Sequence, residues 1–255
     1  MFVNVKNIHL QKYAHTCIMK VLSWNILASE WIDAKTYSEV KKAIRCNASD
    51  RFNRIMKYIN EQDATVILLQ EVMPTEYNKL KTLLRDKYIL TPLCRINWHK
   101  TKNNSGNVTL LKKTDFADKS MQHHRLEFGV QTDCLYKNKA CRIYNIHFSD
   151  VSIQDRYAQL NSIMPLLLET NVGIIGGDFN HQYSKNTRFY NIPNYTIHNT
   201  TCPTYYIERK MNIDNILSKG LKISASSTCP KYPDNMENGF LEYGSDHLPV
   251  TVNIV

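Results

Sequence analysis

The chain has 255 residues, of which 43% are hydrophobic and 22% are charged, so it has enough apolar sequence to bury a large core. It carries 32 Lys and Arg against 23 Asp and Glu, a formal net charge of +9, which favours anionic partners such as nucleic acid or phospholipid headgroups. This composition argues against a disordered chain.

The N-terminal twenty residues interrupt every short apolar run with a polar residue, which excludes a signal-peptide core. No later stretch approaches the ~20 apolar residues that span a membrane. Seven scattered cysteines include no C-x-x-C pair, which favours reduced thiols over a metal or redox motif. We therefore predict an intracellular protein of the cytoplasm or nucleus that is not secreted and forms no stable membrane association. A monomer is the expected state.

The first part of the chain alternates predicted strands and helices. Strands are expected at residues 20–27 and 64–72, the second being a continuous apolar run typical of a buried strand. Between them, residues 49–62 repeat apolar side chains at helical spacing, and Ser49 or Asp50 is the predicted N-cap. This segment is expected to be an amphipathic helix that packs beside the strands.

A second helix is predicted to follow Pro74, with Thr75 as its N-cap. Its predicted apolar stripe consists of Tyr77, Leu80, Leu83 and Leu84. Strands are then expected at residues 107–112, 126–136 and 141–148.

The third helix is predicted at residues 152–169, and Pro165 should kink it or split off its last turn. Its predicted apolar face consists of Ile153, Tyr157, Leu160, Met164 and Leu167. Further strands are expected at 171–177, 212–218, 221–227 and 248–255, with a long loop at 228–244.

The order of these elements predicts the fold class. The last strands have no helices between them, which favours α/β layers over a doubly wound fold. We expect a four-layer sandwich in which two stacked mixed sheets are flanked by helices. The chain shows no internal repeat and no linker, so residues 1–255 are predicted to form one domain.

Polar side chains stand at the ends of the apolar strands throughout the chain. They are Asn25, Glu71, His147, Asp178 and Asn180, and later Asp214, Asp246 and His247. Burying one unpaired carboxylate costs several kcal/mol. Several carboxylates at the ends of buried strands are therefore expected to converge on a cation or on each other. We therefore expect these eight side chains to form one functional site.

Such a set of side chains can carry out phosphoryl transfer. Glu71, helped by Asp246, can hold Mg²⁺, which takes few protein carboxylates and keeps waters that a phosphate replaces. Asp178 is placed to orient or deprotonate the attacking water. Asp214 would hold His247 in one tautomer. The donors that would stabilise charge on phosphate oxygens are Asn25, Asn180, His147 and His247.

Each of these residues alone also has a purely structural explanation. Asn25 at a strand end is a common turn or cap residue, and His147 would serve equally well as a hydrogen-bonded core histidine. Asp178 and Asn180 often form turns after strands. The joint pattern outweighs these separate explanations.

The stretches "SWN", "LLQEV", "IHFSD", "GGDFN", "NIDNIL" and "GSDHLPV", in that order, resemble the motifs of the endonuclease/exonuclease/phosphatase superfamily, also called the deoxyribonuclease I-like fold. The resemblance covers about residues 19–254. It implies a four-layer sandwich, Mg²⁺ or Mn²⁺ dependence, and hydrolysis of a phosphomonoester or phosphodiester. It assigns catalysis to Asp178, His247, His147, Asn180 and Asp214, metal binding to Glu71, Asp246 and Asn25, and substrate binding to Asn25, Asn180 and His147.

Within the superfamily the local signals differ. "VLSWNILASEW" is similar to deadenylase-type exonucleases, whereas "LLQEVMPTEYNKLK" resembles the phosphodiesterases that release tyrosine from DNA 5′ ends. Substrate choice is set by loops such as 28–48 and 181–211, which carry no motif. Candidate base-stacking residues are Trp31, Trp98, Tyr205 and Tyr206.

We therefore predict a Mg²⁺-dependent phosphodiesterase that acts on nucleic acid, as an exonuclease, an endonuclease or an enzyme that removes a 5′ adduct. One alternative is a phosphatase or phosphodiesterase on inositol phosphates or phospholipids. The other is a non-catalytic nucleic-acid-binding module.

Overall fold

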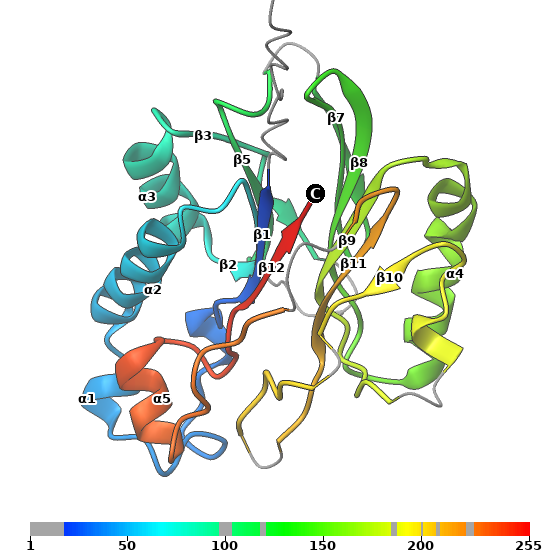
Figure 1. Ribbon diagram of the computed structural model, residues 1–255. Coiled ribbons are helices and arrows are strands. Elements are labelled where there is room, and N and C mark those ends of the chain that lie inside the picture. Colours follow the sequence, from blue (N-terminus) through cyan, green and yellow to red (C-terminus); the bar gives the residue numbers. More distant parts are fainter. Residues whose placement is uncertain are drawn as a thin grey trace, which may run out of the picture.

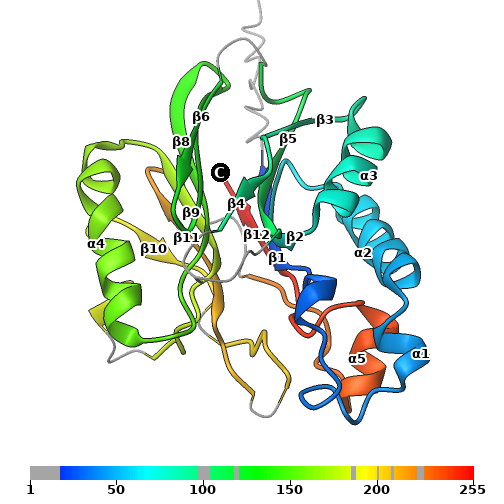
Figure 2. The same ribbon diagram turned by 180° about the vertical axis from the view of Figure 1, so that it is seen from behind.

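Two six-stranded mixed sheets stack face to face in the computed structural model, and helices cover their outer faces (Figures 1 and 2). The structure describes residues 18–96, 104–117, 121–184, 188–199, 201–207, 210–222 and 227–255. This arrangement confirms the predicted α/β fold class. The organisation of residues 1–255 as one domain stays a prediction. None of the described helices is long and apolar enough to cross a membrane.

The first sheet has the strand order β12-β1-β2-β5-β3, with β4 paired to β5. Strand β1 runs parallel to β2 and antiparallel to β12. The bounds are β1 (Met19–Asn25), β2 (Val66–Val72), β3 (Tyr88–Leu90), β4 (Cys94–Arg95), β5 (Gly106–Lys112) and β12 (Val250–Ile254). Helices α2 (Ala48–Gln62) and α3 (Pro74–Leu84) cover the outer face of this sheet, because their apolar stripes pack into one core cluster with β1 and β2.

The second sheet has the strand order β10-β11-β9-β8-β7-β6. Strand β9 runs parallel to β8 and antiparallel to β11. The bounds are β6 (Gln122–Leu126), β7 (Gly129–Tyr136), β8 (Lys139–His147), β9 (Gly173–Asp178), β10 (Thr196–Ile197) and β11 (Asp214–Lys219). Helix α4 (Ile153–Glu169) covers the outer face through Leu160, Ile163 and Leu167.

A buried polar joint connects the inner faces of the two sheets. Asn145 on β8 donates from Nδ2 to the carbonyl oxygens of Leu69 (3.1 Å) and Val108 (3.0 Å) in the first sheet. Its Oδ1 accepts from the amides of Gln70 (2.8 Å) and Asn107 (3.2 Å). All three side chains are fully buried among apolar residues. Hydrogen bonds are directional, whereas apolar packing is not, so this joint sets the position of one sheet on the other.

Several sequence predictions about helix ends were wrong. The N-cap of α2 is Asn47, whose Oδ1 accepts from the backbone N–H of Asp50, and neither Ser49 nor Asp50 caps the helix. The N-cap position of helix α3 lies two residues earlier than expected, at Met73 in place of Thr75. The missing side-chain cap is compensated because the Glu76 carboxylate accepts from the Met73 N–H at 3.0 Å.

Two predicted helix faces and one predicted helix break also differ from the structure. Leu83 is 61% exposed and Ile153 is 41% exposed, so neither belongs to a buried stripe. Helix α4 runs through Pro165 to Glu169 without losing its last turn. Pro165 and Asn161 are both exposed, so the carbonyl of Asn161, which loses its helical donor to the proline, can bond to water.

Other differences concern segments with weak periodicity. Residues 122–136 form a β6–β7 hairpin where a single strand at 126–136 was predicted. The predicted loop at 228–244 contains a short helix, α5 (Met236–Glu242), and the motif-free segment 28–48 contains α1 (Lys42–Arg45). Short strands β3 and β4 were not predicted. Most of the predicted strand at 221–227 lies outside the described residues.

Replacing Asn145 with Leu should destabilise the protein by about 2–4 kcal/mol, because buried carbonyl and amide groups on β2 and β5 of the first sheet lose their partner in the second sheet. Urea denaturation would measure the loss. Asn78→Leu, on the exposed face of α3, is the control and should change stability by less than about 0.5 kcal/mol. Equal effects of the two substitutions would contradict a stabilising role for the joint.

Candidate active site

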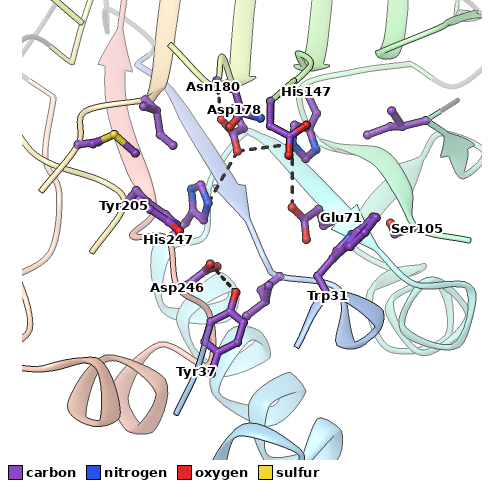
Figure 3. Close-up of a pocket in the computed structure, with 15 residues that line it drawn as sticks. Trp31, Tyr37, Glu71, Ser105, His147, Asp178, Asn180, Tyr205, Asp246 and His247 are labelled. Carbon is purple, nitrogen blue, oxygen red and sulfur yellow. Dashed lines mark hydrogen bonds and ion pairs between the residues drawn. The ribbon is translucent and has the colours of Figure 1, made fainter. Parts of the chain in front are cut away.

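The eight polar residues predicted to form a site lie together at one edge of the two sheets. Figure 3 shows six of them around the pocket, all except Asn25 and Asp214. Among the parallel strands, β1 ends there with Asn25, and β2 carries Glu71 one residue before its end. The parallel strands β8 and β9 end there with His147 and Asp178. The antiparallel strand β11 begins at the same edge, and its Asp214 is the register partner of Asp178. The loop before β12 brings Asp246 and His247 to the same place, and Asn180 follows β9.

A bulge in β2 turns Glu71 into the pocket. The register of β2 against β5 shifts between Leu69 and Val72, and Glu71 has a positive φ of 57°. Asn25 Nδ2 donates to Glu71 Oε1 at 2.8 Å, and the Ala28 N–H donates to Oε2 at 2.9 Å. Both oxygens of this carboxylate are therefore held in a fixed orientation.

Two glycines before Asp178 let β9 lie close to its neighbours. A side chain on Gly176 would meet Leu68 from the opposite sheet. Gly177 has φ +149°, and a Cβ there would overlap the carbonyl oxygen of Ile146 on β8. The double glycine thus allows Asp178 to stand at the point where the two sheets come together.

Asp178 lies at the centre of the site and is 1% exposed. Its Oδ1 accepts from the backbone N–H of Asn180 at 2.7 Å, and its Oδ2 accepts from Asn25 Nδ2 at 3.1 Å. The Nε2 atoms of His147 and His247 lie 3.6 and 3.8 Å from the same Oδ2. The two imidazoles therefore face Asp178 from opposite sheets.

Asp214 orients His247. The distance from Asp214 Oδ2 to His247 Nδ1 is 2.8 Å, and both side chains are buried. This hydrogen bond places the proton on Nδ1 and turns Nε2 toward Asp178. The ring of Tyr205 packs on the imidazole with a centroid distance of 5.0 Å. Trp24 Nε1 donates to the His247 carbonyl oxygen at 2.9 Å and fixes the backbone.

Buried Arg51 ties together two of the loops that carry site residues. Its Nε donates to the carbonyl of Gly244 at 2.6 Å, and its NH2 group donates to the carbonyls of Ile26 (3.0 Å) and Leu27. Ile26 and Leu27 follow Asn25 in the chain, and Gly244 lies two residues before Asp246. The guanidinium, on α2, therefore holds the ends of β1 and the loop before β12 at a constant spacing.

The site opens into a pocket of about 300 Å³ that has a strongly acidic lining. Its acidic lining residues are Glu71, Asp150, Asp178 and Asp246, and Asp214 lies directly behind His247. Among the described residues that line the pocket, none is Lys or Arg. The acidic side chains outnumber the two lining histidines, so a phosphate that enters this pocket requires a further positive charge, such as a metal ion.

The pKa values of the site carboxylates reflect this crowding. Burial raises the pKa of Glu71, and the nearby Asp246 raises it further. Burial and the neighbouring Asp214 raise the pKa of Asp178 to about 7. Such carboxylates resist ionisation until a cation binds among them, which is the behaviour expected of a metal site.

The two histidines are shifted in opposite directions. Burial lowers the pKa of His147, which therefore stays neutral at pH 7. Burial also opposes protonation of His247, but Asp214, Asp246 and Asp178 together outweigh it and raise the pKa of His247 well above its usual value. The site thus contains one neutral and one cationic imidazole.

The donor set fits a hard divalent cation. Ligand atoms of Asp178, Asp214 and His247 lie within 4.8 Å of one another and form one candidate group. In this structure, however, His247 Nδ1 is already hydrogen-bonded to Asp214. The Glu71 and Asp246 carboxylates, which the sequence singled out, face the same pocket and offer the oxygen ligands that Mg²⁺ and Mn²⁺ prefer.

A model of the Endonuclease/Exonuclease/phosphatase family matches residues 22–247 of this chain. The chain belongs to this family. Family members are metal-dependent hydrolases of phosphoric esters, and this chain is such an enzyme. No curated protein sequence matches the chain.

Solved structures with a similar fold include family members that share little sequence with this chain. D. rerio TDP2 complexed with a single-strand DNA product has 14% identity and a TM-score of 0.64, and the match covers 93% of this chain and 99% of that chain. ANGEL2, a 2′,3′-cyclic phosphatase, has 16% identity and a TM-score of 0.70, with coverage of 93% and 95%. A Bacteroides vulgatus endonuclease/exonuclease/phosphatase has 14% identity and a TM-score of 0.67, with coverage of 94% and 99%.

Several pocket residues were not identified from the sequence. Tyr37, Ser105 and Met211 line the pocket but belong to no motif, and no local pattern would have revealed them. Of the four candidate stacking residues, Trp31 and Tyr205 line the pocket, whereas Tyr206 is buried in the core and Trp98 lies outside the described residues. Pocket residues without a motif come from loops whose positions depend on tertiary packing.

Replacing Asp178 with Asn should stabilise the metal-free protein at pH 8 by about 1–3 kcal/mol. Because folding raises the pKa of Asp178, its favourable contribution is present below about pH 4 and is lost as the pH rises through about 7. The neutral amide does not suffer this loss, so the gain should shrink as the pH falls. Denaturant unfolding with a chelator at pH 5 and pH 8 would measure it. A variant less stable than the wild type at pH 8 would contradict the expectation.

Proposed function

We propose that this enzyme is a Mg²⁺-dependent phosphodiesterase that hydrolyses phosphodiester bonds in nucleic acid. The observation that carries the proposal is the acidic pocket, without a described Lys or Arg in its lining, in a chain of net charge +9. The positive charge outside the pocket would attract an extended polyanion, while the acidic centre would admit one phosphate together with a metal ion. An extended anionic substrate suits both features.

The structural neighbours support nucleic acid as the substrate class. The TDP2 structure contains a single-strand DNA product, and an ANGEL2 structure is a complex with adenosine-2′,3′-vanadate. Both ligands are nucleic acid or nucleotide. A monomeric state and a cytoplasmic or nuclear location stay predictions.

Glu71 and Asp246 would hold the metal ion, with Asn25 beside them. When bound, the ion would act as a Lewis acid that stabilises charge on the phosphate oxygens. Asn25 supports Glu71 directly, because its amide donates to Glu71 Oε1 at 2.8 Å. The carboxylate is thereby kept oriented before the metal ion and the substrate bind.

Asp178 would orient and deprotonate the water that attacks the phosphorus in line with the leaving group. Its pKa of about 7 suits a general base near neutral pH. His247, made cationic by Asp214, would donate from Nε2 to a phosphate oxygen. Neutral His147 and the amide of Asn180 would add further donors.

Trp31 and Tyr205 would contact the nucleotides around the scissile phosphate. They lie on opposite sides of the pocket and are partly exposed (Figure 3). Aromatic faces at such positions stack on bases with little sequence preference. The pocket would therefore select a nucleic acid strand by its shape and its phosphates more than by its sequence.

A panel of end-labelled substrates would test the reaction. It would contain single- and double-stranded DNA, RNA with a poly(A) tail, a 5′-tyrosyl oligonucleotide and a 2′,3′-cyclic phosphate end. We expect cleavage with Mg²⁺ that stops with a chelator and falls at least about 10²–10⁴-fold in Asp178→Asn. The labelled products would identify the bond that is cleaved.

One control variant and one contrary outcome define the result. Lys57→Gln, an exposed change on α2, should keep wild-type activity. If no oligonucleotide is cleaved while inositol phosphates or phospholipid headgroups are hydrolysed, the nucleic acid substrate is wrong, although the metal-dependent chemistry would stand.

Replacing Trp31 or Tyr205 with Ala should weaken substrate binding about 5- to 100-fold, the effect of losing one base–aromatic stack. The expected signature is a raised KM on oligonucleotides and unchanged hydrolysis of a small phosphodiester without bases. Tyr232→Ala, a partly exposed aromatic outside this pocket, is the control. An equal loss on both kinds of substrate would argue against stacking.

A further inference from the structure

Tyr37 contributes to the pocket although it lies in the motif-free segment 28–48. Its side chain is 4% exposed, and its hydroxyl donates to Asp246 Oδ2 at 2.9 Å (Figure 3). The chain around it makes a turn between the end of β1 and helix α1. Tyr37 thus reaches the site from a different part of the chain than Asp246, which precedes β12.

The phenol ring is rigidly packed. Tyr37 belongs to a small apolar cluster with Leu27, Val40, Ile207 and Phe240. Its ring meets that of Phe240, on α5, edge to face at a centroid distance of 5.4 Å and an interplanar angle of 70°. Because residues from distant segments, Leu27, Ile207 and Phe240, pack with the ring in one cluster, the hydroxyl has one position relative to the pocket.

Asp246 has few other partners in the described part of the chain. It is 4% exposed and forms no ion pair with a described Lys, Arg or His. The next hydrogen-bond donor is the hydroxyl of Ser245, 3.5 Å from Oδ1. The neighbouring Glu71 repels it, so Asp246 would turn away from the pocket unless a donor held it there.

Tyr37 is suited to be that donor under all physiological conditions. A phenol ordinarily has a pKa of about 10, so the tyrosine hydroxyl carries a proton that it can donate to the carboxylate. A neutral hydroxyl orients a carboxylate without cancelling its negative charge, in contrast to a Lys or Arg. Asp246 accordingly remains fully able to bind a cation.

We propose that Tyr37 is a positioning residue that holds the Asp246 carboxylate in one orientation at the metal-binding centre and thereby sets metal affinity. This inference rests on the proposed function in one respect, namely that Asp246 binds the metal ion. It assigns a role to a segment that the family motifs do not include. The aromatic and apolar residues of segment 28–48 then build both the wall of the pocket and the support of its metal site.

The test is Tyr37→Phe, which removes one oxygen atom and leaves the apolar cluster intact. The control is Tyr88→Phe, because the Tyr88 hydroxyl is also buried and also makes a 2.9 Å hydrogen bond, to the carbonyl of Ala64 at the opposite end of β2. Mn²⁺ binding by titration calorimetry, thermal unfolding with a chelator, and kcat at saturating Mg²⁺ would be measured for both. We expect the Mn²⁺ Kd to rise about tenfold in Tyr37→Phe and to stay unchanged in Tyr88→Phe.

A double-mutant cycle with Asp246→Asn separates positioning from general stability. If Tyr37 acts through Asp246, Tyr37→Phe should weaken Mn²⁺ binding in the wild-type background and add nothing in the Asp246→Asn background. Additive effects would overturn the proposal, as would a wild-type Kd in Tyr37→Phe.

The outcomes also separate this proposal from the proposed function. If Tyr37→Phe weakens Mn²⁺ binding while the wild type cleaves no oligonucleotide, the positioning role stands and the substrate is wrong. If the wild type cleaves oligonucleotides and Tyr37→Phe binds Mn²⁺ normally, the positioning role is wrong and the substrate stands.

Discussion

The structure depends on the burial of several carboxylates in one pocket that has no Lys or Arg in its described lining. Asp178 and Asp214 are at most 1% exposed, and Glu71 and Asp246 face the same space. Their mutual repulsion and desolvation raise the pKa values of Glu71 and Asp178. The protein tolerates this cost because hydrogen bonds hold each carboxylate, and because a divalent cation would neutralise them. The feature that weakens the metal-free fold is the same one that prepares it for catalysis.

The layered fold supplies the geometry that this constraint requires. Two parallel strand pairs, one in each sheet, end at the same edge, and the antiparallel strands β11 and β12 begin there. Asn145, two residues before His147, then fixes the two sheets relative to each other through Gln70, the residue before Glu71, and through the Leu69 carbonyl. Buried Arg51 and the Tyr37 phenol hold the adjoining loops. The site is therefore positioned by polar contacts inside the molecule, while the apolar layers provide most of the stability.

Much of the fold and most of the site could be predicted from the sequence. Strands β1, β2, β8 and β9 were visible as apolar runs, because a buried strand must be apolar on both faces. A polar residue at the end of such a run is conspicuous because the residues before it are apolar. Asp178, which follows two glycines, is one example. Local signals were less reliable where alternatives of similar energy compete. Asn47 caps α2 in place of its neighbours Ser49 and Asp50, and α5 forms in a segment rich in loop residues.

The sequence by itself was enough to predict two stacked sheets flanked by helices. Its motifs, in their order along the chain, also identified the eight polar residues that converge. Those features follow from local periodicity and from the residue types that phosphoryl transfer requires. Only the tertiary structure decided which oxygen of Asp178 meets each histidine, how the bulge turns Glu71, and that Trp31, Tyr37 and Tyr205 line the pocket. These positions arise from contacts between segments far apart in the chain. Nothing in the local sequence records such contacts, because each segment acquires its position only when the others pack against it.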